Sequence, residues 1–395
     1  MAVAGARSPT RVQPFAVVAG ALFVMLLDGN LPTPLYGVYR EAFGFSATTL
    51  TLIFAVYALA LVPSLLVFGQ LSDRVGRRPV IVGGLGVAAL GLVLLAVAQS
   101  TAALIVGRAV QGIALGAVVG TIPAALVELE PDGDHSRAAT AAVLGQSGGS
   151  AAGPLLAGAL AQWAPAPRQL CYAVGVAVTA AAIAGILKVG EPRPASGEWR
   201  LQKPSVPAAI RAGFARSCVT CGSVWAVGAL FLSVVPSYAA DLLDTSDLAL
   251  LGAISAVMLA MACVAQAVSL RGAITPERAQ PVGLGLLIAG IAALLAAFPL
   301  HALALVLAAA VLAGTGLGLG YFGSQSTINR LAPADRRGEV TAAFITCIYL
   351  GVSFTAIGTG LLGDALSLAT AVAIAGGVVA ALAAAATAWH LAGSA

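Results

Sequence analysis

Long apolar stretches separated by short polar loops repeat along the whole chain. A helix needs about 20 apolar residues to cross a hydrocarbon core of ~30 Å, and twelve segments reach that length. The predicted spans are residues 14–36, 48–68, 79–99, 102–124, 138–162, 169–187, 213–236, 247–269, 280–298, 301–323, 339–362 and 366–389. The pattern therefore predicts an all-α membrane protein with twelve transmembrane helices.

The longest polar segment, residues 189–211, divides the twelve spans into six and six. Its charged residues and prolines are typical of a linker between two packed units. We therefore expect an N-terminal six-helix bundle over residues 1–188, a cytoplasmic linker over 189–211 and a C-terminal six-helix bundle over 212–395.

The two halves carry the same residue types at a constant spacing, which indicates a duplication. At an offset of 202 residues, Pro34 pairs with Pro236, Tyr36 with Tyr238, Pro79 with Pro281 and Pro131 with Pro333, and several glycines coincide as well. Parallel six-helix repeats related by an axis normal to the membrane occur in secondary transporters, which carry substrate between the repeats. The expected fold is two pseudo-symmetric bundles with a path between them.

Composition and charge agree with a membrane protein and set its orientation. Of the 395 residues 59% are hydrophobic and 9% charged, against about 25% charged in a soluble domain. Sorting Lys and Arg by loop places 17 on the side of the termini, two on the opposite side and one within a span. Because cytoplasmic loops are enriched in Lys and Arg, we expect a multi-pass protein of the inner or plasma membrane with both termini cytoplasmic.

Several other classes of protein are not supported by the sequence. The net charge of +4 is scattered, whereas nucleic-acid binding would require a basic stripe. No Walker loop, dinucleotide fingerprint or nucleophile elbow occurs, so we expect neither a cofactor nor enzymatic activity. Cys218 and Cys221 have metal-like spacing without a second pair, and we expect no metal site.

The loop between the second and third spans carries a specific string, Gly69-Gln-Leu-Ser-Asp73-Arg-Val-Gly-Arg-Arg78-Pro. It resembles the signature loop of the major facilitator superfamily, G-x-L-x-D-R-x-G-R-R. An ordinary basic turn that only sets topology is the alternative. The resemblance implies a loop whose charges form and break contacts as the two halves move. We call this the gating loop; its candidate residues are Gly69, Asp73, Arg74, Gly76, Arg77 and Arg78.

Two charges are placed deep within predicted spans. Arg108 costs at least ~2.5 to 3.5 kcal/mol in a span unless it snorkels or finds a partner, and Asp28 lies at a similar depth by helix rise. The string Arg108-Ala-Val-Gln111-Gly112 resembles the family's R-x-x-Q-G motif, which is associated there with proton transfer. Asp28 and Arg108 are therefore candidates for proton coupling; a purely structural ion pair, or snorkelling of Arg108, is the alternative.

The fifth span has small residues at every fourth position, followed by a proline. Gly145, Gly149, Gly153 and Ala157 form a smooth face against which another helix can pack, and Pro154 bends the helix. Generic packing is the alternative. The compound G-x-x-x-G-P-x-x-A-G resembles the motif of the superfamily's antiporters, with Ala157 in place of a glycine. Its candidate residues are Gly149, Gly153, Pro154 and Gly158.

Other polar and aromatic side chains within the spans are candidates to line a substrate cavity. They are Asn30, Tyr57, Gln111, Gln146, Trp225, Tyr321, Gln325 and Tyr349. For each one, helix packing or a hydrogen bond between helices is an equal alternative. A cavity with one acid would tolerate lipophilic cations, and neutral or zwitterionic substrates stay open.

Together these features resemble the twelve-span drug:proton antiporters of the major facilitator superfamily. The resemblance implies export of small lipophilic molecules in exchange for protons by alternating access. A proton-coupled importer of a sugar, organic acid or amino acid is one alternative, and a non-transporting membrane sensor or scaffold is another. The expected partners are a small-molecule substrate, protons and the lipid bilayer, and we expect a monomer.

Overall fold

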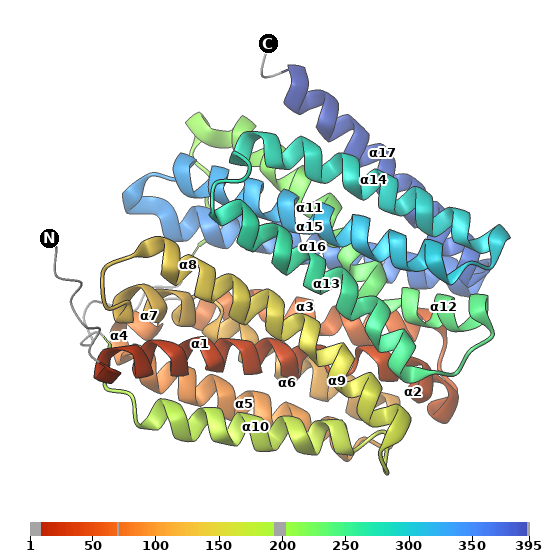
Figure 1. Ribbon diagram of the computed structural model, residues 1–395, viewed down its shortest axis with the longest axis horizontal. Helices are drawn as coiled ribbons and strands as arrows, with labels where there is room; N and C mark the ends of the chain where they lie inside the picture. The colour runs from red at the N-terminus through yellow and green to blue at the C-terminus, as the bar shows by residue number, and fades with distance from the viewer. Residues whose placement is uncertain (1–8, 69–70, 193–202, 393–395) are drawn as a thin grey trace, which may run out of the picture.

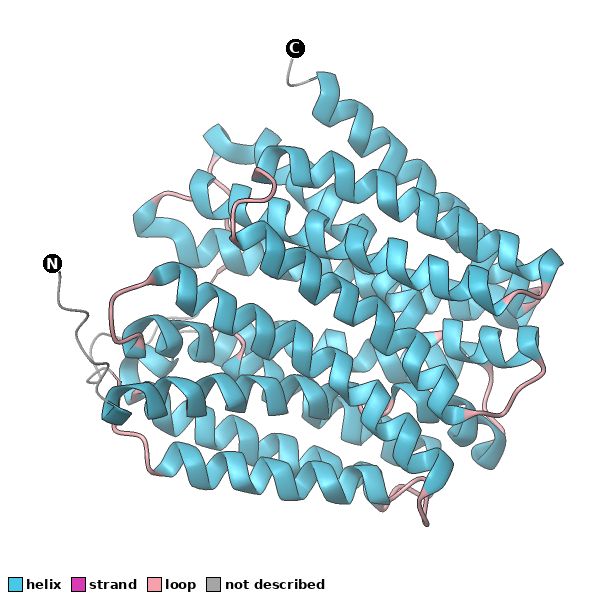
Figure 2. Ribbon diagram, viewed as in Figure 1, coloured by secondary structure: helices cyan, strands magenta, loops and turns pink. Residues whose placement is uncertain are grey.

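The computed structural model describes residues 9–68, 71–192 and 203–392, and all regular secondary structure in these ranges is helical (Figure 2). The first half contains α1 (Pro9–Asn30), η1 (Thr33–Leu35), α2 (Tyr36–Phe43), α3 (Ala47–Phe68), α4 (Leu71–Val75), α5 (Arg77–Ala96), α6 (Thr101–Val118), α7 (Thr121–Leu129), α8 (His135–Val143), η2 (Leu144–Gly148), α9 (Gly149–Trp163) and α10 (Leu170–Leu187). The second half contains η3 (Ala208–Ile210), α11 (Arg211–Ser233), α12 (Val235–Leu243), α13 (Leu248–Leu270), α14 (Pro276–Leu300), α15 (Leu303–Leu331), η4 (Ala334–Arg336), α16 (Arg337–Ala365) and α17 (Leu368–Ala392).

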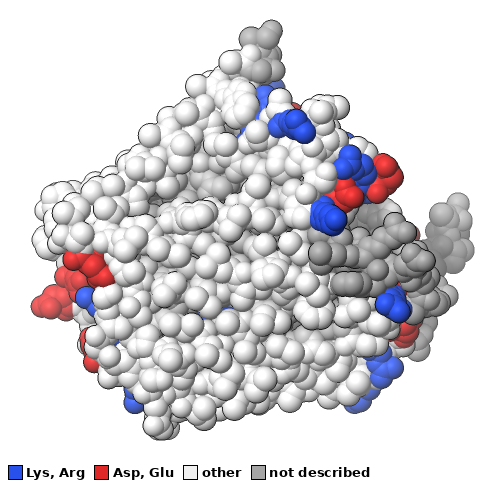
Figure 3. All heavy atoms as spheres, turned by 180° about the vertical axis from the view of Figure 1, so that it is seen from behind, with Lys and Arg blue, Asp and Glu red and all other residues white. Residues whose placement is uncertain are grey.

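Eleven helices of the described chain are long and apolar enough to cross a membrane. On the face that Figure 3 shows, most charged side chains lie toward two opposite ends of the molecule, and the surface between these ends is almost free of charge. A bilayer requires such a surface, because a charged side chain facing hydrocarbon is costly. The all-α class and the membrane-spanning character predicted from sequence are therefore confirmed.

The predicted fifth span, residues 138–162, differs from the others. It is helical, but it consists of α8, the π-helical segment η2 and α9, and so it is absent from the set of eleven. The segment Leu144-Gly-Gln-Ser-Gly148 contains two glycines that weaken regular α-helix. Single π-turns inside helices are frequent at functional sites. Because this segment is helical but divided, the count of twelve transmembrane helices stays a prediction.

The predicted first span, residues 14–36, is also interrupted. Helix α1 ends at Asn30, and the 3-10 turn η1 and α2 continue the chain to Phe43. Pro32 and Pro34 lie at the break, where the missing backbone N–H groups prevent a continuous α-helix. The break begins at Leu31, so Asp28 lies in the last turn of α1.

The helices run between two ends of the molecule, as Figure 1 shows. We call the end at which α1 begins and α17 ends the terminal end, and the opposite end, at which α2 and α12 lie, the far end. The two halves meet where α3 packs against α16 and α9 packs against α13. These contacts position a cavity between the halves.

At the far end, each half caps the beginning of a helix of the other half. The Asp364 carboxylate of α16 accepts hydrogen bonds from the backbone N–H groups of Ala47, at 2.8 Å, and Thr48, at 3.0 Å, at the start of α3. The Gln162 Oε1 atom of α9 accepts one from the N–H of Leu248 at the start of α13, at 2.8 Å. Gln162 and Asp364 are separated by the repeat offset of 202 residues. The far end is therefore closed by two equivalent caps.

At the terminal end, by contrast, a pocket lies between the halves; we call it the vestibule. Residues of α7, α8, α13, α15 and α16 line it, among them Pro123, Ala142, Leu270, Gln325, Asn329 and Ile345. The described structure is thus closed at the far end and hollowed at the terminal end.

Candidate functional site

A central cavity lies between the two halves and shares several lining residues with the vestibule. Six of the eight cavity candidates line the central cavity: Asn30, Tyr57, Gln146, Trp225, Tyr321 and Tyr349. The last four of these six also line the vestibule, and so does Gln325. Gln111 lines a separate small pocket together with Asp28. The lining comes from helices of both halves, as a path between them requires.

Arg108 of α6 is buried and held by several contacts. Its side chain is 2% exposed, and its Nη1 donates to the carbonyl oxygen of Gly29 and to Gln111 Oε1, both at 2.8 Å. The guanidinium lies over the Tyr57 ring, 4.3 Å from its centroid. Gln111 Nε2 in turn donates to the backbone carbonyl of Asp28 at 3.0 Å. Arg108 therefore does not snorkel to the surface, and it is connected to the Asp28 backbone through Gly29 and Gln111.

Asp28 of α1 is also buried, at 1% exposed, but its carboxyl group faces α10. Oδ2 accepts a hydrogen bond from Thr179 Oγ1 at 2.5 Å. Oδ1 lies beside Gly175 of α10, where an added Cβ would be 3.1 Å from it. Oδ1 has no hydrogen-bond partner in the described structure, and no ion pair joins Asp28 to Arg108 there. Asp28 and Arg108 therefore lie close together, as their similar predicted depths indicated, but their side chains form no direct ion pair in the described structure.

Thr179 is a site residue that the sequence interpretation missed. It is fully buried on α10, and its hydroxyl is the described hydrogen-bond donor to the Asp28 carboxyl group. Because the predicted sixth span is strongly apolar, its sequence did not mark a single threonine as a candidate site residue. Comparing the depths of polar residues across all spans, rather than of charges alone, could have found it.

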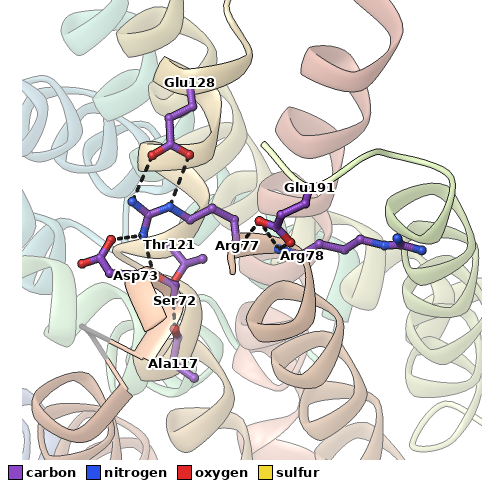
Figure 4. Close-up of polar contacts among 8 residues, drawn as sticks. All are labelled: Ser72, Asp73, Arg77, Arg78, Ala117, Thr121, Glu128 and Glu191. Carbon is purple, nitrogen blue, oxygen red and sulfur yellow. Dashed lines mark hydrogen bonds and ion pairs between the residues drawn. The ribbon is translucent and has the colours of Figure 1, made fainter. Parts of the chain in front are cut away.

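The gating loop forms a network within the first half (Figure 4). Arg77 Nη1 lies 2.9 Å from Asp73 Oδ1 and donates to Ser72 Oγ at 2.5 Å, while Nη2 lies 3.0 Å from Glu128 Oε1 of α7. The Arg77 side chain is 9% exposed and that of Asp73 is 52% exposed. Arg74 is exposed. Arg77 is therefore the buried centre of the network, and Asp73 lies at its open edge.

Glu191, from the segment after α10, holds the start of α5 (Figure 4). Its carboxylate accepts from the backbone N–H of Arg77 at 2.6 Å and from that of Arg78 at 3.2 Å, as an acid at a helix N-terminus should. Gly76 has φ +98°, and a Cβ there would lie 2.7 Å from the Glu191 carboxylate. Glycine is therefore needed at position 76 for two reasons: the backbone φ is positive there, and a side chain would displace the Glu191 carboxylate that caps α5. Gly69, the first residue predicted for this loop, lies outside the described residues.

The glycines of the predicted antiporter motif lie at close helix crossings. A Cβ at Gly149 would overlap the Phe23 carbonyl, and one at Gly153 would lie 2.5 Å from the Leu27 carbonyl, both on α1. A Cβ at Gly158 would lie 2.5 Å from the carbonyl of Leu248 in the other half. Pro154 lies inside α9. One face of α9 therefore packs first on α1 and then, at the far end, on α13.

Comparison with known proteins identifies the family. The sequence model of the Major Facilitator Superfamily matches residues 18–356. The chain is 38% identical to the inner membrane transport protein YajR of Escherichia coli over 121 residues, which is 30% of this chain and 26% of that protein. It is 34% identical to the multidrug efflux pump LfrA of Mycolicibacterium smegmatis over 158 residues, which is 39% of this chain and 31% of that protein.

The fold agrees with solved structures of low sequence identity. The structure of the nucleoside transporter NupG superposes with a TM-score of 0.77 at 12% identity, covering 96% of this chain and 99% of that one. The chain matches less than a third of the length of the two curated relatives above. The family consists of membrane transporters, in agreement with the expectation of a transporter rather than an enzyme. With the model matched across most of its length, this chain belongs to the Major Facilitator Superfamily.

Proposed function

We propose that this protein is a secondary active transporter that exports small lipophilic molecules in exchange for protons by alternating access. The observation that carries the proposal is the buried pair of Asp28 and Arg108, connected through Gly29 and Gln111 beside a cavity between the halves. Ionisable residues at such depth are rare and usually functional in membrane proteins.

In this proposal the two predicted bundles move relative to each other. Residues 1–188 and 212–395 are two six-helix bundles joined by the cytoplasmic linker 189–211, and α8, η2 and α9 together complete the set of twelve crossings. Both termini lie in the cytoplasm, so the vestibule at the terminal end receives substrate from inside the cell. The far end then opens to release substrate outside.

Asp28 carries the proton in the exchange. Its Oδ1 lacks a hydrogen-bond partner in the described structure, so the carboxyl group has an oxygen free to take up a proton. Arg108 donates to the backbone carbonyl of Gly29 and Gln111 to that of Asp28, which holds this part of the backbone in place. One proton moving down a membrane potential supplies about 2.3 kcal/mol per 100 mV, which is enough to drive a substantial concentration ratio.

Export is supported by two further observations. The helix packing of the Gly149, Gly153 and Gly158 face follows the antiporter-type motif that the sequence resembles. The partial relatives include a protein named as a multidrug efflux pump. These favour outward transport over import.

A proteoliposome assay tests the proposal. An imposed pH gradient should drive transport of at least one member of a panel of lipophilic anions, neutral compounds and cations, against the proton flow. Asp28→Asn should abolish gradient-driven accumulation, whereas Asp241→Asn, at an exposed carboxylate of the far end, should leave it unchanged. Accumulation by Asp28→Asn equal to wild type would disprove the coupling role, and transport in the direction of the protons would indicate an importer.

A further inference from the structure

The walls of the transport path carry almost no charge. Among the described residues lining the central cavity and the vestibule, Arg108 is the one Lys, Arg, Asp or Glu side chain. Asp28 lies behind Gly29 in the separate small pocket, with its carboxyl group directed to Thr179. The acid expected in the cavity, where it would tolerate lipophilic cations, lines neither the central cavity nor the vestibule, because the Asp28 carboxyl group faces another helix.

Two residues that line the cavity each have a hydrogen-bond donor without a partner in the described structure. Trp225 of α11 and Arg108 of α6 both line the central cavity, and Trp225 Nε1 and Arg108 Nε are buried without a hydrogen-bond acceptor among the described residues. A buried donor left unpaired costs free energy that a bound acceptor would recover. The two donors come from opposite halves, so a ligand that accepts from both would contact both moving units.

The remainder of the cavity suits an aromatic body. Phe54, Tyr57, Trp225, Tyr321 and Tyr349 line it, and the Trp225 and Tyr321 rings meet edge to face with centroids 6.0 Å apart and planes at 89°. Aromatic rings supply large apolar contact area with defined geometry. A flat apolar molecule would therefore be bound mainly through ring contacts.

No described carboxylate lines the cavity to balance a positive charge. Arg108 would repel a cation, with little screening at a buried site. The face of Tyr57, which could otherwise attract a cation, is already covered by the Arg108 guanidinium. The cavity thus offers hydrogen-bond donors and apolar rings without a carboxylate to balance a cationic substrate.

From this geometry we infer that the substrate is an aromatic molecule that offers hydrogen-bond acceptors and carries no positive charge. Sulfonamides, carbonyl compounds and sulfonates are examples of this chemistry. The inference rests on the proposed function in placing the substrate in the central cavity, but it concerns binding and does not depend on proton coupling.

Three probes with one bicyclic body test it: naphthalene-1-sulfonate, naphthalene-1-sulfonamide and the permanently charged trimethyl(1-naphthylmethyl)ammonium. Binding to the full chain in lipid nanodiscs is measured by equilibrium dialysis at constant ionic strength. We expect the sulfonate and the sulfonamide to bind at least about tenfold tighter than the ammonium compound, a difference of about 1.4 kcal/mol. Equal or tighter binding of the ammonium compound would overturn the inference.

Substitutions locate the site. Trp225→Phe keeps an aromatic ring but removes the indole donor, and it should weaken sulfonamide binding about fivefold, the effect of one hydrogen bond. Trp163→Phe is the matched control, because Trp163 is 76% exposed at the far end of α9. Unchanged sulfonamide affinity in Trp225→Phe would refute the assigned donor. If the probes bind in the expected order but no pH gradient drives transport, the proposed function fails and this inference stands.

Discussion

The two ends of the molecule differ in how the two halves contact each other. At the far end, Asp364 and Gln162 each cap a helix of the opposite half, and Gly158 and Gly252 allow α9 and α13 to touch. At the terminal end the charges of the gating loop are bonded within the first half, around Arg77, and the vestibule lies between helices of the two halves. The described structure is thus asymmetric from end to end, as the proposed alternating-access cycle requires of a state closed at one end.

The difference shows how closure is achieved at the far end. Backbone N–H groups at helix starts need hydrogen-bond acceptors. At this end the acceptors come from the opposite half. Closure therefore pairs these N–H groups with protein acceptors, and opening would expose them to water. The terminal end has charges in the gating loop that are able to serve the same purpose, but Asp73 is half exposed and directed to Arg77. Asp364 and Gln162 at the far end thus cap helices of the opposite half, whereas Asp73 at the terminal end contacts Arg77 of its own half.

The largest effect should come from a methyl group at the far-end crossing. Gly252→Ala places a Cβ that would overlap the Pro154 carbonyl, and such overpacking costs about 1–3 kcal/mol. Because the closed far end then becomes unfavourable, transport in proteoliposomes should fall by about tenfold or more. Gly222→Ala on α11, where a Cβ meets nothing within 4 Å, is the matched control. Wild-type transport by Gly252→Ala would show that this crossing does not need to close.

A smaller effect is expected from weakening one cap. Asp364→Asn replaces a charged acceptor, whose hydrogen bonds are about twice as strong as neutral ones, and should open the far end about three- to tenfold more often. The measurement is the alkylation rate of a cysteine introduced by Thr51→Cys, at a fully buried position one turn from the cap. The protein is in nanodiscs and lacks its five native cysteines. Asp241→Asn should leave the rate unchanged. A rate that does not rise in Asp364→Asn contradicts the role of the cap.

The smallest effect is expected at the gating loop, and in the opposite direction. If the gating loop closes the terminal end as the caps close the far end, Asp73 then meets a helix start of the second half, where a charge is worth about 0.3–1 kcal/mol. Asp73→Asn should therefore reduce alkylation of Thr51→Cys about two- to fivefold. Since Asp73 is 52% exposed, thermal unfolding should barely change. A raised alkylation rate would mean that Asp73 stabilises the described state instead.

Most of the fold could be predicted from the sequence because its signals are local. Apolar length located the spans, and the spacing of Gly149, Gly153 and Gly158 anticipated a face of close contacts. The matching depths of Asp28 and Arg108 anticipated that they lie near one another. Each of these follows from helix geometry alone.

What could not be predicted depends on contacts between distant segments. The direction of the Asp28 carboxyl group is set by Thr179, 151 residues away, and the acceptor for the start of α3 lies 317 residues away at Asp364. The π-helical segment η2 arises where Gly149 lets α9 approach the Phe23 backbone. Helical periodicity carries no information on such pairings.

Exchange of substrate for protons is best tested by proton movement that the substrate itself drives. Proteoliposomes containing a pH-sensitive dye are loaded with a transported member of the probe panel, with the membrane potential clamped by potassium and valinomycin. As the probe leaves down its gradient, we expect the lumen of wild-type vesicles to become acidic and the lumen of Asp28→Asn vesicles to keep its pH. An alkaline shift in the wild type, or probe efflux without any pH change, would contradict the exchange.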